Sequence, residues 1–457
     1  MNQSPELSRI LCEHIANMRF EDISHAAARR TEDLFLDWLG SGLAGAGASS
    51  VSALRQFADV MGPSTGESQT FDWMSNTSPY FAAMINAAAS HVVEQDDLHN
   101  GSVLHPATVV FPPLLAVSQM HAVSGEQFIT AAVAGYEAGI RIGEYLGRSH
   151  YKVFHTTATV GTMAAAMAVG KLLNFDTQML QHTLGSAGTQ AGGLWEFLRS
   201  AADSKQLHTA KAAADGMLAA YTAYFGLTGA ERILEGKQGV NAGMLGDGNI
   251  TRITEHLGTN GVLETSFKYH ASCRHTHPSA DALLKIVTEH SISAENIATI
   301  EARVYQAAED VLGPVTDPQS IHQAKFSMGF VLALIASKHS AGVADFTKAA
   351  LSDPELRSLH DKVTMVVDAE IDHVYPTQWS AKVILVTKDG QKFEKLVAEP
   401  KGDPGNMLTR PELETKFLML AELHPGMDSG EAERLIGAAW NMQSFIDTGK
   451  EFRITAK

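Results

Sequence analysis

Cysteine is scarce in this chain of 457 residues: only Cys12 and Cys273 occur, far apart in the sequence. Two distant cysteines form neither a disulfide framework nor the paired spacing of a zinc finger or a redox motif, and they fit a reducing compartment. Charged residues are also few, at 19%, whereas hydrophobic residues make up 45%. This balance excludes intrinsic disorder and predicts a globular protein, long enough for two or three domains.

Positive charge and long hydrophobic runs are in short supply as well. The chain has 35 Lys and Arg against 51 Asp and Glu, a net charge of −16, which opposes attraction to nucleic acid and to anionic membranes. No apolar run reaches the roughly 18 residues of a membrane span, and the N-terminal segment alternates polar and apolar residues like an amphipathic helix. We therefore expect a cytoplasmic protein that has no nucleic acid and no membrane as a partner.

The signatures of several common enzyme classes are missing. The sequence has no GxxxxGKS/T phosphate loop, HExxH zinc pair, EF-hand loop or GxSxG elbow. The glycines at 45–50 follow a helical stretch and not a strand, so we interpret them as a loop after a helix and not as a dinucleotide site. Phosphate cradling, zinc proteolysis, calcium sensing and serine hydrolysis therefore lack their usual residues.

Helical periodicity is the main feature that is present. From about Leu7 to Leu257, apolar residues recur at three- and four-residue spacing among many alanines and glycines. After Phe267 the residue pattern changes from helical periodicity to β-branched or alternating segments. These segments predict strands at 297–305, 362–372 and 381–400, the last with a turn at Asp389-Gly390. Helices are predicted at 324–338 and 353–360 between these strands, and again at 410–423 and 429–445.

These patterns predict a mainly α protein with a discontinuous helical domain. Residues 1–265 form its first part, residues 266–400 form a smaller α+β domain, and residues 401–457 return to the helical domain. The strands and helices of the smaller domain do not alternate regularly, so a series of βαβ units is not expected.

Three polar clusters could carry chemistry. The first, at 91–106, places histidines and carboxylates where a helix gives way to a loop; the alternative is a solvated helix end whose histidines cap carbonyls. The second is His155, just before an Ala-rich helix whose N-cap we expect to be Thr156 or Thr157, so that helix-end amides favour neutral imidazole. Lys205 and His208 add a pair that opens a helix running to Tyr224; a solvated helix end is again the alternative.

The third cluster is the densest and lies at 268–278, between the two predicted domains, where ligand sites are common. It holds two cations, a thiol and three imidazoles: Lys268, His270, Cys273, Arg274, His275 and His277. These groups could imitate a zinc set, but their spacing lacks a second Cys-x-x-Cys half, so we expect no metal. They are better suited to binding a carboxylate-bearing substrate and removing a proton from it.

Taken together, these motifs resemble the MmgE/PrpD family over nearly the whole chain. The matching stretches lie in the family's order at 91–112, 135–141, 154–162, 205–216, 268–282, 325–327 and 401–404. The resemblance implies a large helical domain with a smaller α+β lid domain, a homodimer, an active site in the cleft between the domains, and no metal or organic cofactor. The implied chemistry is proton abstraction next to a carboxylate of a small polycarboxylate substrate.

The resemblance implies that His105, His155, Lys205, Lys268 and Cys273 line the site, with Asp96 and Asp97 in an acidic loop, and we take the first five as the candidate catalytic residues. From the residues themselves we add His99, Arg274, His275 and His277 to Asp96 and Asp97 as candidate substrate-binding residues. For the stabilisation of an enediolate-like charge, the candidates are Lys205, Lys268 and Arg274. A base, His105 or His155, would work on one face of the carbon and Cys273 or Lys268 on the other.

Departures from the family pattern guide the choice of reaction. Decarboxylase-like members carry Asp, Thr, His and Tyr where this chain has Glu94, Leu98, Cys273 and Phe330. Dehydratase-like members have Asp-Thr-Trp and then Gly-His-Pro-Ser, where this chain reads Asp-Leu-His at 97–99 and Leu-His-Pro-Ala at 104–107. The first expectation is therefore an epimerase similar to iminodisuccinate epimerase. A dehydratase similar to 2-methylcitrate dehydratase is the alternative, ahead of a cis-aconitate-type decarboxylase or a non-catalytic binding protein.

Overall fold

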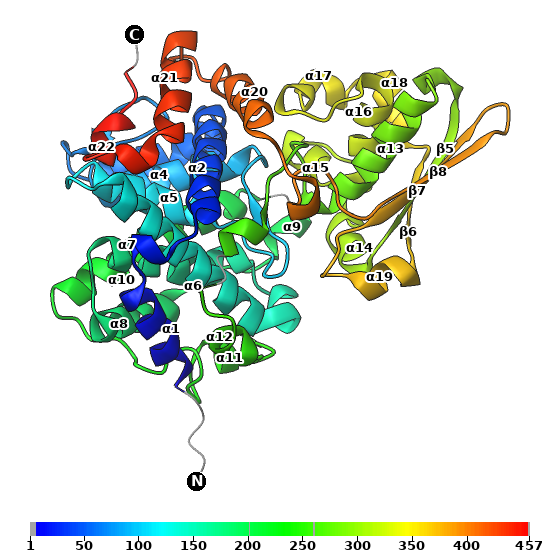
Figure 1. Cartoon of the computed structure of the whole chain (residues 1–457). Coiled ribbons are helices and arrows are strands. Elements are labelled where there is room, and N and C mark those ends of the chain that lie inside the picture. Colours follow the sequence, from blue (N-terminus) through cyan, green and yellow to red (C-terminus); the bar gives the residue numbers. More distant parts are fainter. Residues whose placement is uncertain (1–5, 201, 259–260, 456–457) are drawn as a thin grey trace. The chain divides into compact units, whose positions relative to one another are not determined.

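The structure, a computed structural model, describes residues 6–200, 202–258 and 261–455 (Figure 1). The chain divides into two compact units: the first combines the chain up to Thr265 with the chain from Thr409 onward, and the second is Ser266–Leu408. The predicted mainly α fold is confirmed. Within the described residues, no helix is both long and apolar enough to cross a membrane.

The first unit is built from helices, with two-residue strands in its loops. The helices are α1 (Leu7–Asn17), α2 (His25–Gly45), α3 (Ser49–Met61), α4 (Pro79–Val92), α5 (Ala107–Ser118), α6 (Gly125–Tyr151), α7 (Thr156–Leu172), α8 (Thr177–Gln190), α9 (Phe197–Ser200), α10 (Ser204–Tyr224), α11 (Val240–Gly243), α12 (Thr251–Thr254), α20 (Arg410–Ala421), α21 (Ser429–Trp440) and α22 (Thr448–Glu451). The C-terminal helices α20 and α21, orange to red in Figure 1, pack on α2, so the two ends of the chain share one core.

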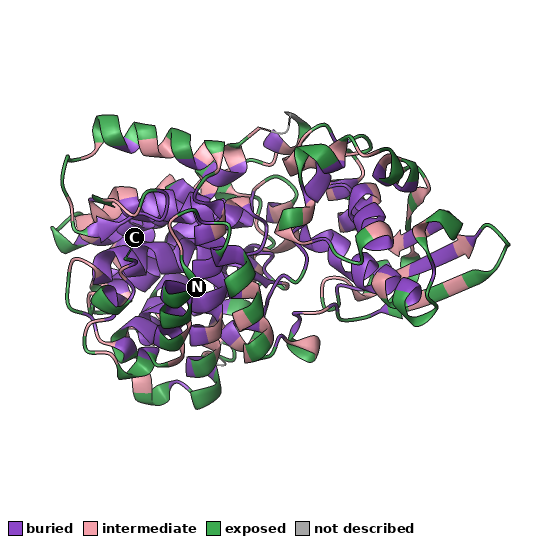
Figure 2. Ribbon diagram, turned by 90° about the horizontal axis from the view of Figure 1, so that it is seen from above, coloured by how far each residue is buried: buried purple, intermediate pink, exposed green. Residues whose placement is uncertain are grey.

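Helices α5 and α7 are buried along almost their whole length, and the purple interior in Figure 2 marks the core of this unit. Small residues let the helices approach closely. Helix α10 packs on α7 at Gly216, where an added Cβ would lie 2.4 Å from the Cβ of Ala165. Close packing of this kind leaves little room for larger side chains, and it fixes the helix ends that carry the polar clusters.

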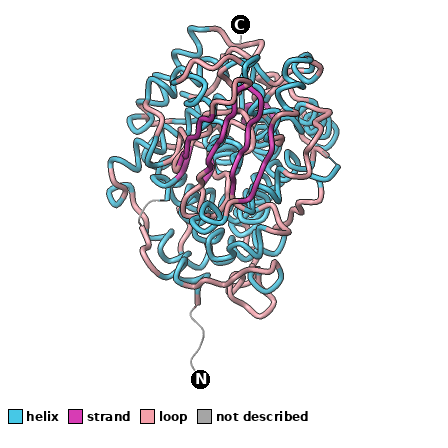
Figure 3. The backbone as a smooth tube through the Cα atoms, turned by 90° about the vertical axis from the view of Figure 1, so that its right-hand side faces the viewer, coloured by secondary structure: helices cyan, strands magenta, loops and turns pink. Residues whose placement is uncertain are grey.

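The second unit contains a four-stranded mixed sheet in the order β6-β5-β7-β8 (Figure 3). Its strands are β5 (Ile297–Val304), β6 (Val363–Val367), β7 (Ala381–Thr387) and β8 (Lys392–Val397). Strand β6 runs parallel to β5, whereas β7 is antiparallel to both of its neighbours. The hairpin at Asp389-Gly390 forms as predicted, and Gly390 adopts the left-handed conformation that this turn needs, with φ of +85°.

The second unit also contains helices. They are α13 (His277–Glu289), α14 (Gln306–Leu312), α15 (Ile321–Lys325), α16 (Met328–Lys338), α17 (Lys348–Leu351), α18 (Pro354–His360) and α19 (Ala369–Val374). Helix α13 packs on β7 and β8, and α16 packs on α13 and α18. The single helix predicted at 324–338 is in fact two, because Ser327 begins a new helix by accepting a hydrogen bond from the backbone N–H of Phe330, at 3.3 Å.

The second unit extends eight residues further than the predicted boundary, to residue 408 instead of 400. Hydrogen bonds hold the turn after residue 400 to this unit. The backbone N–H of Lys401 donates to Asp281, at 2.6 Å, and that of Phe267 donates to the carbonyl of Gly402, at 2.9 Å. Arg274 also pairs with Asp403. Sequence periodicity does not reveal such contacts, since they join segments that are more than a hundred residues apart.

Candidate active site

The loop between α4 and α5 is buried, and this rules out the solvated helix end that was the alternative for the first cluster. Asp96 and Asp97 are fully buried, His99 is 3% exposed and His105 is 9% exposed. Buried polar groups require hydrogen-bond partners, and here the partners come from residues 91–107 themselves and from Tyr136 of α6. The first cluster is therefore a built polar network within the helical unit.

Asp97 holds the loop in place. Its Oδ1 accepts the backbone N–H of Ala107, at 3.0 Å, and its Oδ2 is 2.7 Å from the hydroxyl of Tyr136. Burial raises the pKa of Asp97 well above its ordinary value. Both oxygens are thus occupied by groups of α5 and α6. This geometry favours a structural role for Asp97 over the predicted contact with substrate.

Asp96 bridges two histidines. Its Oδ2 lies 2.7 Å from His91 Nδ1 and 3.1 Å from His105 Nδ1. Burial raises the pKa of Asp96, but the two imidazoles outweigh burial and hold that pKa below its usual range, so the carboxylate is ionised. The geometry gives Asp96 a positioning role toward the histidines, whereas the sequence had suggested contact with substrate.

The contacts of His105 fix its tautomer. Its Nδ1 lies 2.6 Å from the carbonyl oxygen of Asp97, and a carbonyl only accepts hydrogen bonds, so Nδ1 carries the proton. The other ring nitrogen, Nε2, is then the one that can take a proton from another molecule. The arrangement holds His105 in a defined orientation, with Nε2 as its candidate proton acceptor.

His91, the last buried residue of α4, lies between the other imidazoles. Its ring centroid is 4.8 Å from that of His105 and 5.8 Å from that of His155, on which it stacks. Burial lowers the pKa of His91 to about 4. Its Nε2 has no hydrogen-bond partner within the described parts of the chain. The predicted site residues do not include His91, although the first cluster and the family-like stretch both begin with it.

His155 is itself the N-cap residue of α7, so the prediction of Thr156 or Thr157 as N-cap is wrong. The backbone N–H of His155 donates to the carbonyl of Gly193, at 3.1 Å, and its ring packs on Trp195, with centroids 4.6 Å apart. Burial lowers the pKa of His155 well below its ordinary value. No signal in the sequence pointed to Trp195, because it lies 40 residues along the chain in an irregular segment.

Lys205 forms an ion pair with Glu94, and both side chains are buried, at 3% and 1% exposed. The solvated helix end that was the alternative for Lys205 is therefore wrong. Glu94 has a positive φ of +58°, uncommon for a residue other than glycine, and such strain tends to gather at functional sites. Three of the predicted catalytic residues, His105, His155 and Lys205, belong to the helical unit. They are buried there as neighbours of one another.

The remaining predicted residues lie in the second unit. Lys268 is 1% exposed, and Cys273 begins a short 3-10 helix and donates its backbone N–H to the carbonyl of Lys325, at 2.8 Å. Arg274 is 3% exposed and pairs with Asp403, while its Nε and Nη1 have no hydrogen-bond partner among the residues that the structure describes. Buried guanidinium nitrogens of this kind can donate hydrogen bonds to an anionic group such as a carboxylate.

His277 is fully buried and lies against His270, with ring centroids 5.2 Å apart. Burial, and then the charge of Arg274, hold the pKa of His277 well below its ordinary value. His270 bonds to Asp281, at 2.8 Å. Neutral His277 beside the Arg274 guanidinium therefore adds a polar group without adding a second charge at this point.

Two of the predicted substrate-binding residues, His275 and His99, make contacts that stabilise the fold. His275 bonds to the hydroxyl of Tyr305, at 2.8 Å, and stacks on Trp379, with centroids 4.8 Å apart. His99 bonds to Ser102, at 2.9 Å, inside the loop that follows α4. Their geometry favours roles in holding these segments together.

His91, Asp96 and His105 are close enough to one another to be considered as metal ligands. Their close contacts, however, are those of hydrogen bonds, because one carboxylate oxygen faces the Nδ1 atoms of both rings and a carbonyl faces one of them. A metal would have to replace the proton on His105 Nδ1. The donor set therefore fits a proton network better than a metal site.

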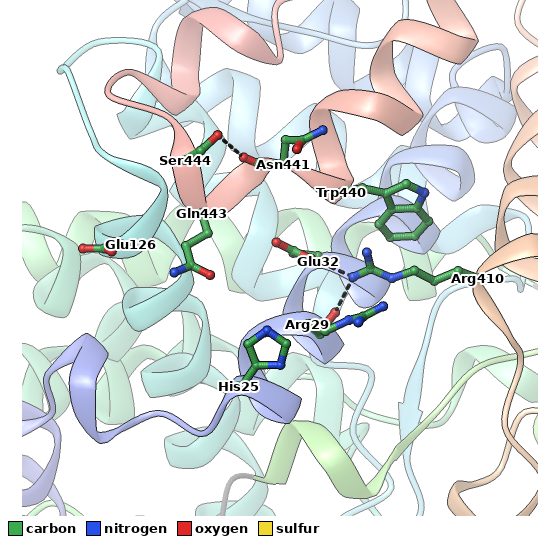
Figure 4. Close-up of a pocket in the computed structure, with 9 residues that line it drawn as sticks. All are labelled: His25, Arg29, Glu32, Glu126, Arg410, Trp440, Asn441, Gln443 and Ser444. Carbon is green, nitrogen blue, oxygen red and sulfur yellow. Dashed lines mark hydrogen bonds and ion pairs between the residues drawn. The ribbon is translucent and has the colours of Figure 1, made fainter.

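A separate cavity of about 490 Å³ lies on the helical unit (Figure 4). It is lined by His25, Arg29, Glu32, Glu126, Arg410, Trp440, Asn441, Gln443 and Ser444. The guanidinium of Arg410 bonds to Glu32, at 2.6 Å, and lies 4.0 Å from the ring of Trp440. Because Arg410 is paired with Glu32 and a second carboxylate, that of Glu126, also lines this cavity, we do not assign it to a carboxylate-bearing ligand.

The family resemblance implied a discontinuous helical unit and a smaller α+β unit, and the structure has both. Two family models match the chain: the MmgE/PrpD N-terminal domain over residues 9–253 and the MmgE/PrpD C-terminal domain over residues 270–442. The protein therefore belongs to the MmgE/PrpD family, and the predicted family is confirmed.

Curated relatives are similar over most of their length. A cis-aconitate decarboxylase-like protein, oryM, of Aspergillus oryzae is 26% identical, with 96% of this chain and 95% of the relative covered. The cis-aconitate decarboxylase of Mus musculus is 25% identical, with 88% and 84% covered. That of Aspergillus terreus is 27% identical, with 86% and 84% covered. These relatives are named as enzymes, whereas the expected homodimer and cytoplasmic location stay predictions.

Proposed function

We propose that this protein is a cofactor-independent enzyme that moves a proton at a carbon next to a carboxylate of a small di- or tricarboxylate. The observation that carries this proposal is the buried network in which His105 and His155 have different fixed partners. Burial lowers the pKa of His155, so this ring is neutral near neutral pH and has a lone pair that can accept a proton. Membership of the family and the names of the relatives support the same class of reaction.

The cations among the candidate residues of the two units support a carboxylate substrate. Proton loss next to a carboxylate builds negative charge on its oxygens, and fixed cations stabilise that charge. Arg274, with two nitrogens available, is our candidate for holding a substrate carboxylate. Lys205 and Lys268 remain proposed partners of the enediolate-like state, and Lys205 would exchange part of its contact with Glu94 for the substrate.

Within this class, we propose epimerisation as the first candidate reaction. Two proton-transfer groups are then needed, and we keep His105 or His155 as one and Cys273 or Lys268 as the other. The support comes from departures from decarboxylase-like members at Glu94 and Leu98, of which Leu98 is a buried apolar residue with no hydroxyl to offer a substrate.

Decarboxylation is the second candidate, and the names of the curated relatives favour it. Loss of CO₂ leaves an electron pair on carbon that must be protonated, so the same histidines would act as acids instead of bases. Dehydration, the other reaction considered from the sequence, would need the second group to protonate a leaving hydroxyl.

Proton NMR of a panel of polycarboxylates in deuterium oxide tests all three reactions. The purified enzyme should exchange the hydrogen next to a carboxylate in at least one substrate, and the product spectrum separates inversion from loss of CO₂ or water. An Arg274→Lys variant should raise KM because a lysine offers one nitrogen where the guanidinium presents both Nε and Nη1. Absence of any exchange or product across cis-aconitate, methylcitrate, citrate and iminodisuccinate would refute the proposed function.

A further inference from the structure

His208 shares a hydrogen bond with the buried base candidate His155. The two Nδ1 atoms lie 3.2 Å apart, and the ring centroids 5.4 Å apart. A bond between two imidazole nitrogens requires one N–H and one lone pair. The two facing nitrogens of this pair therefore hold a single proton between them, and each ring decides the tautomer of the other.

The two rings differ in burial. His155 is 1% exposed, whereas His208, in the first turns of α10, is only half-buried. Gly193 makes this approach possible, because a Cβ there would lie 3.3 Å from His208 Nδ1 and 2.4 Å from the Cβ of Ala158. Phe197 packs edge-on against His208, with centroids 5.4 Å apart. The backbone and an aromatic ring thus hold His208 between the buried His155 and the surface.

We infer that His208 is a proton relay that connects His155 with solvent. This inference rests on the proposed function, and it assigns to His208 a positioning and relay role that acts through His155 and not through contact with substrate.

The relay is balanced in atoms and charge. At the start, His155 carries its proton on Nδ1 and His208 carries its proton on Nε2. When His155 Nε2 takes a proton from the substrate carbon, the Nδ1 proton of His155 passes to His208 Nδ1. His155 ends neutral, with its proton on Nε2, and His208 becomes an imidazolium that releases its Nε2 proton to water. The net result is one proton moved from carbon to solvent, and the reverse sequence delivers one.

The surroundings of the pair favour passing the proton on over storing it. His91, His105 and Lys205 face His155, and Lys211 faces His208. Burial and then these positive or ionisable neighbours lower both pKa values, that of His208 to about 4. A proton that reaches the pair therefore leaves it readily at neutral pH.

The first test compares the wild-type enzyme with His208→Gln in deuterium oxide. Glutamine can still accept the N–H of His155 but cannot pass a proton on, so the proton taken from the substrate should return to it instead of exchanging. We expect solvent deuterium incorporated per turnover to fall about tenfold or more, with little change in KM, and added imidazole to restore it. The control is His182→Gln, a half-buried histidine of α8 outside this network, which should incorporate deuterium like the wild type.

The outcomes separate the two proposals. If the wild type exchanges no substrate of the panel, the proposed function fails, and the relay fails with it. If the wild type exchanges and His208→Gln incorporates the same deuterium per turnover, only the relay is refuted. A second measurement needs no variant: ¹⁵N NMR of histidine-labelled wild type should show coupling between two Nδ1 atoms across the shared hydrogen bond, and its absence would overturn the relay.

Discussion

Replacing Asp96 by asparagine should slow the reaction strongly while leaving substrate binding nearly unchanged. The buried carboxylate accepts hydrogen bonds from His91 and His105 through the same oxygen, at 2.7 and 3.1 Å. Asparagine keeps the shape and one acceptor oxygen but removes the negative charge. When His105 takes a proton, that charge stabilises the resulting imidazolium, so its loss is felt in the transition state.

The size of the effect follows from the two hydrogen bonds. A bond to a charged group contributes about 1 to 2 kcal/mol more than a neutral one, so the pair accounts for about 2 to 4 kcal/mol. At about 1.4 kcal/mol per factor of ten, kcat should fall about 30- to 1000-fold. We expect KM to change little, because the side chain of Asp96 is 0% exposed.

Steady-state kinetics, with circular dichroism to confirm folding, would measure this effect, and Asp97→Asn provides a matched control. Burial raises the pKa of Asp97 well above its ordinary value, so asparagine imitates the neutral form of that side chain and should cost much less activity. If Asp96→Asn keeps wild-type kcat, or if it mainly raises KM, the positioning role of Asp96 is wrong and the contact with substrate predicted from the sequence is favoured.

Three further predictions concern stability and metals. The contribution of His91 to the free energy of unfolding should fall by about 3 kcal/mol as pH drops from about 6.5 to 4, because over this range His91 binds a proton in the unfolded chain and not in the folded protein. Asp97, whose pKa is raised in the folded protein, acts in the opposite direction. Urea titrations that give the same free energy of unfolding over this pH range would contradict the expected net loss. Gly216→Ala should lower Tm through overpacking worth about 1 to 3 kcal/mol, whereas Gly437→Ala, with open space around its Cβ in α21, should not; equal Tm values would refute the packing argument. Activity should survive exhaustive chelation, and loss restored only by zinc would favour a metal at Asp96.

Several elements could be predicted from the sequence because their signals are local. Alternation at 297–305 and 381–400 predicted strands that form as β5, β7 and β8, and Asp389-Gly390 supplied its own turn. The break between α15 and α16 was missed, since Ser327 is a capping residue inside an otherwise continuous apolar pattern. The boundary near residue 400 was missed for a different reason, because long-range hydrogen bonds from Lys401 decide it.

The site was only partly predictable. His105, His155 and Lys205 stand in recognisable motifs, so they could be named in advance. His91 stands in the first cluster, but its contact with His155 could not be foreseen, because the two residues are 64 positions apart in the chain. Trp195 lies in an irregular segment that gave no signal. The role of Asp96 also changed once its two histidine contacts were visible.

The sequence by itself determined the helical and mixed-sheet segments, the acidic net charge, the family and the residue types available for proton transfer, because each follows from local composition, periodicity or motif order. Only the tertiary structure decided which of these groups meet. Glu94 and Lys205 are 111 residues apart in the chain, and His155 and His208 are 53 apart, yet each pair is in contact. Burial among packed helices then sets the ionisation of these groups, and that burial depends on the whole fold and not on any one segment.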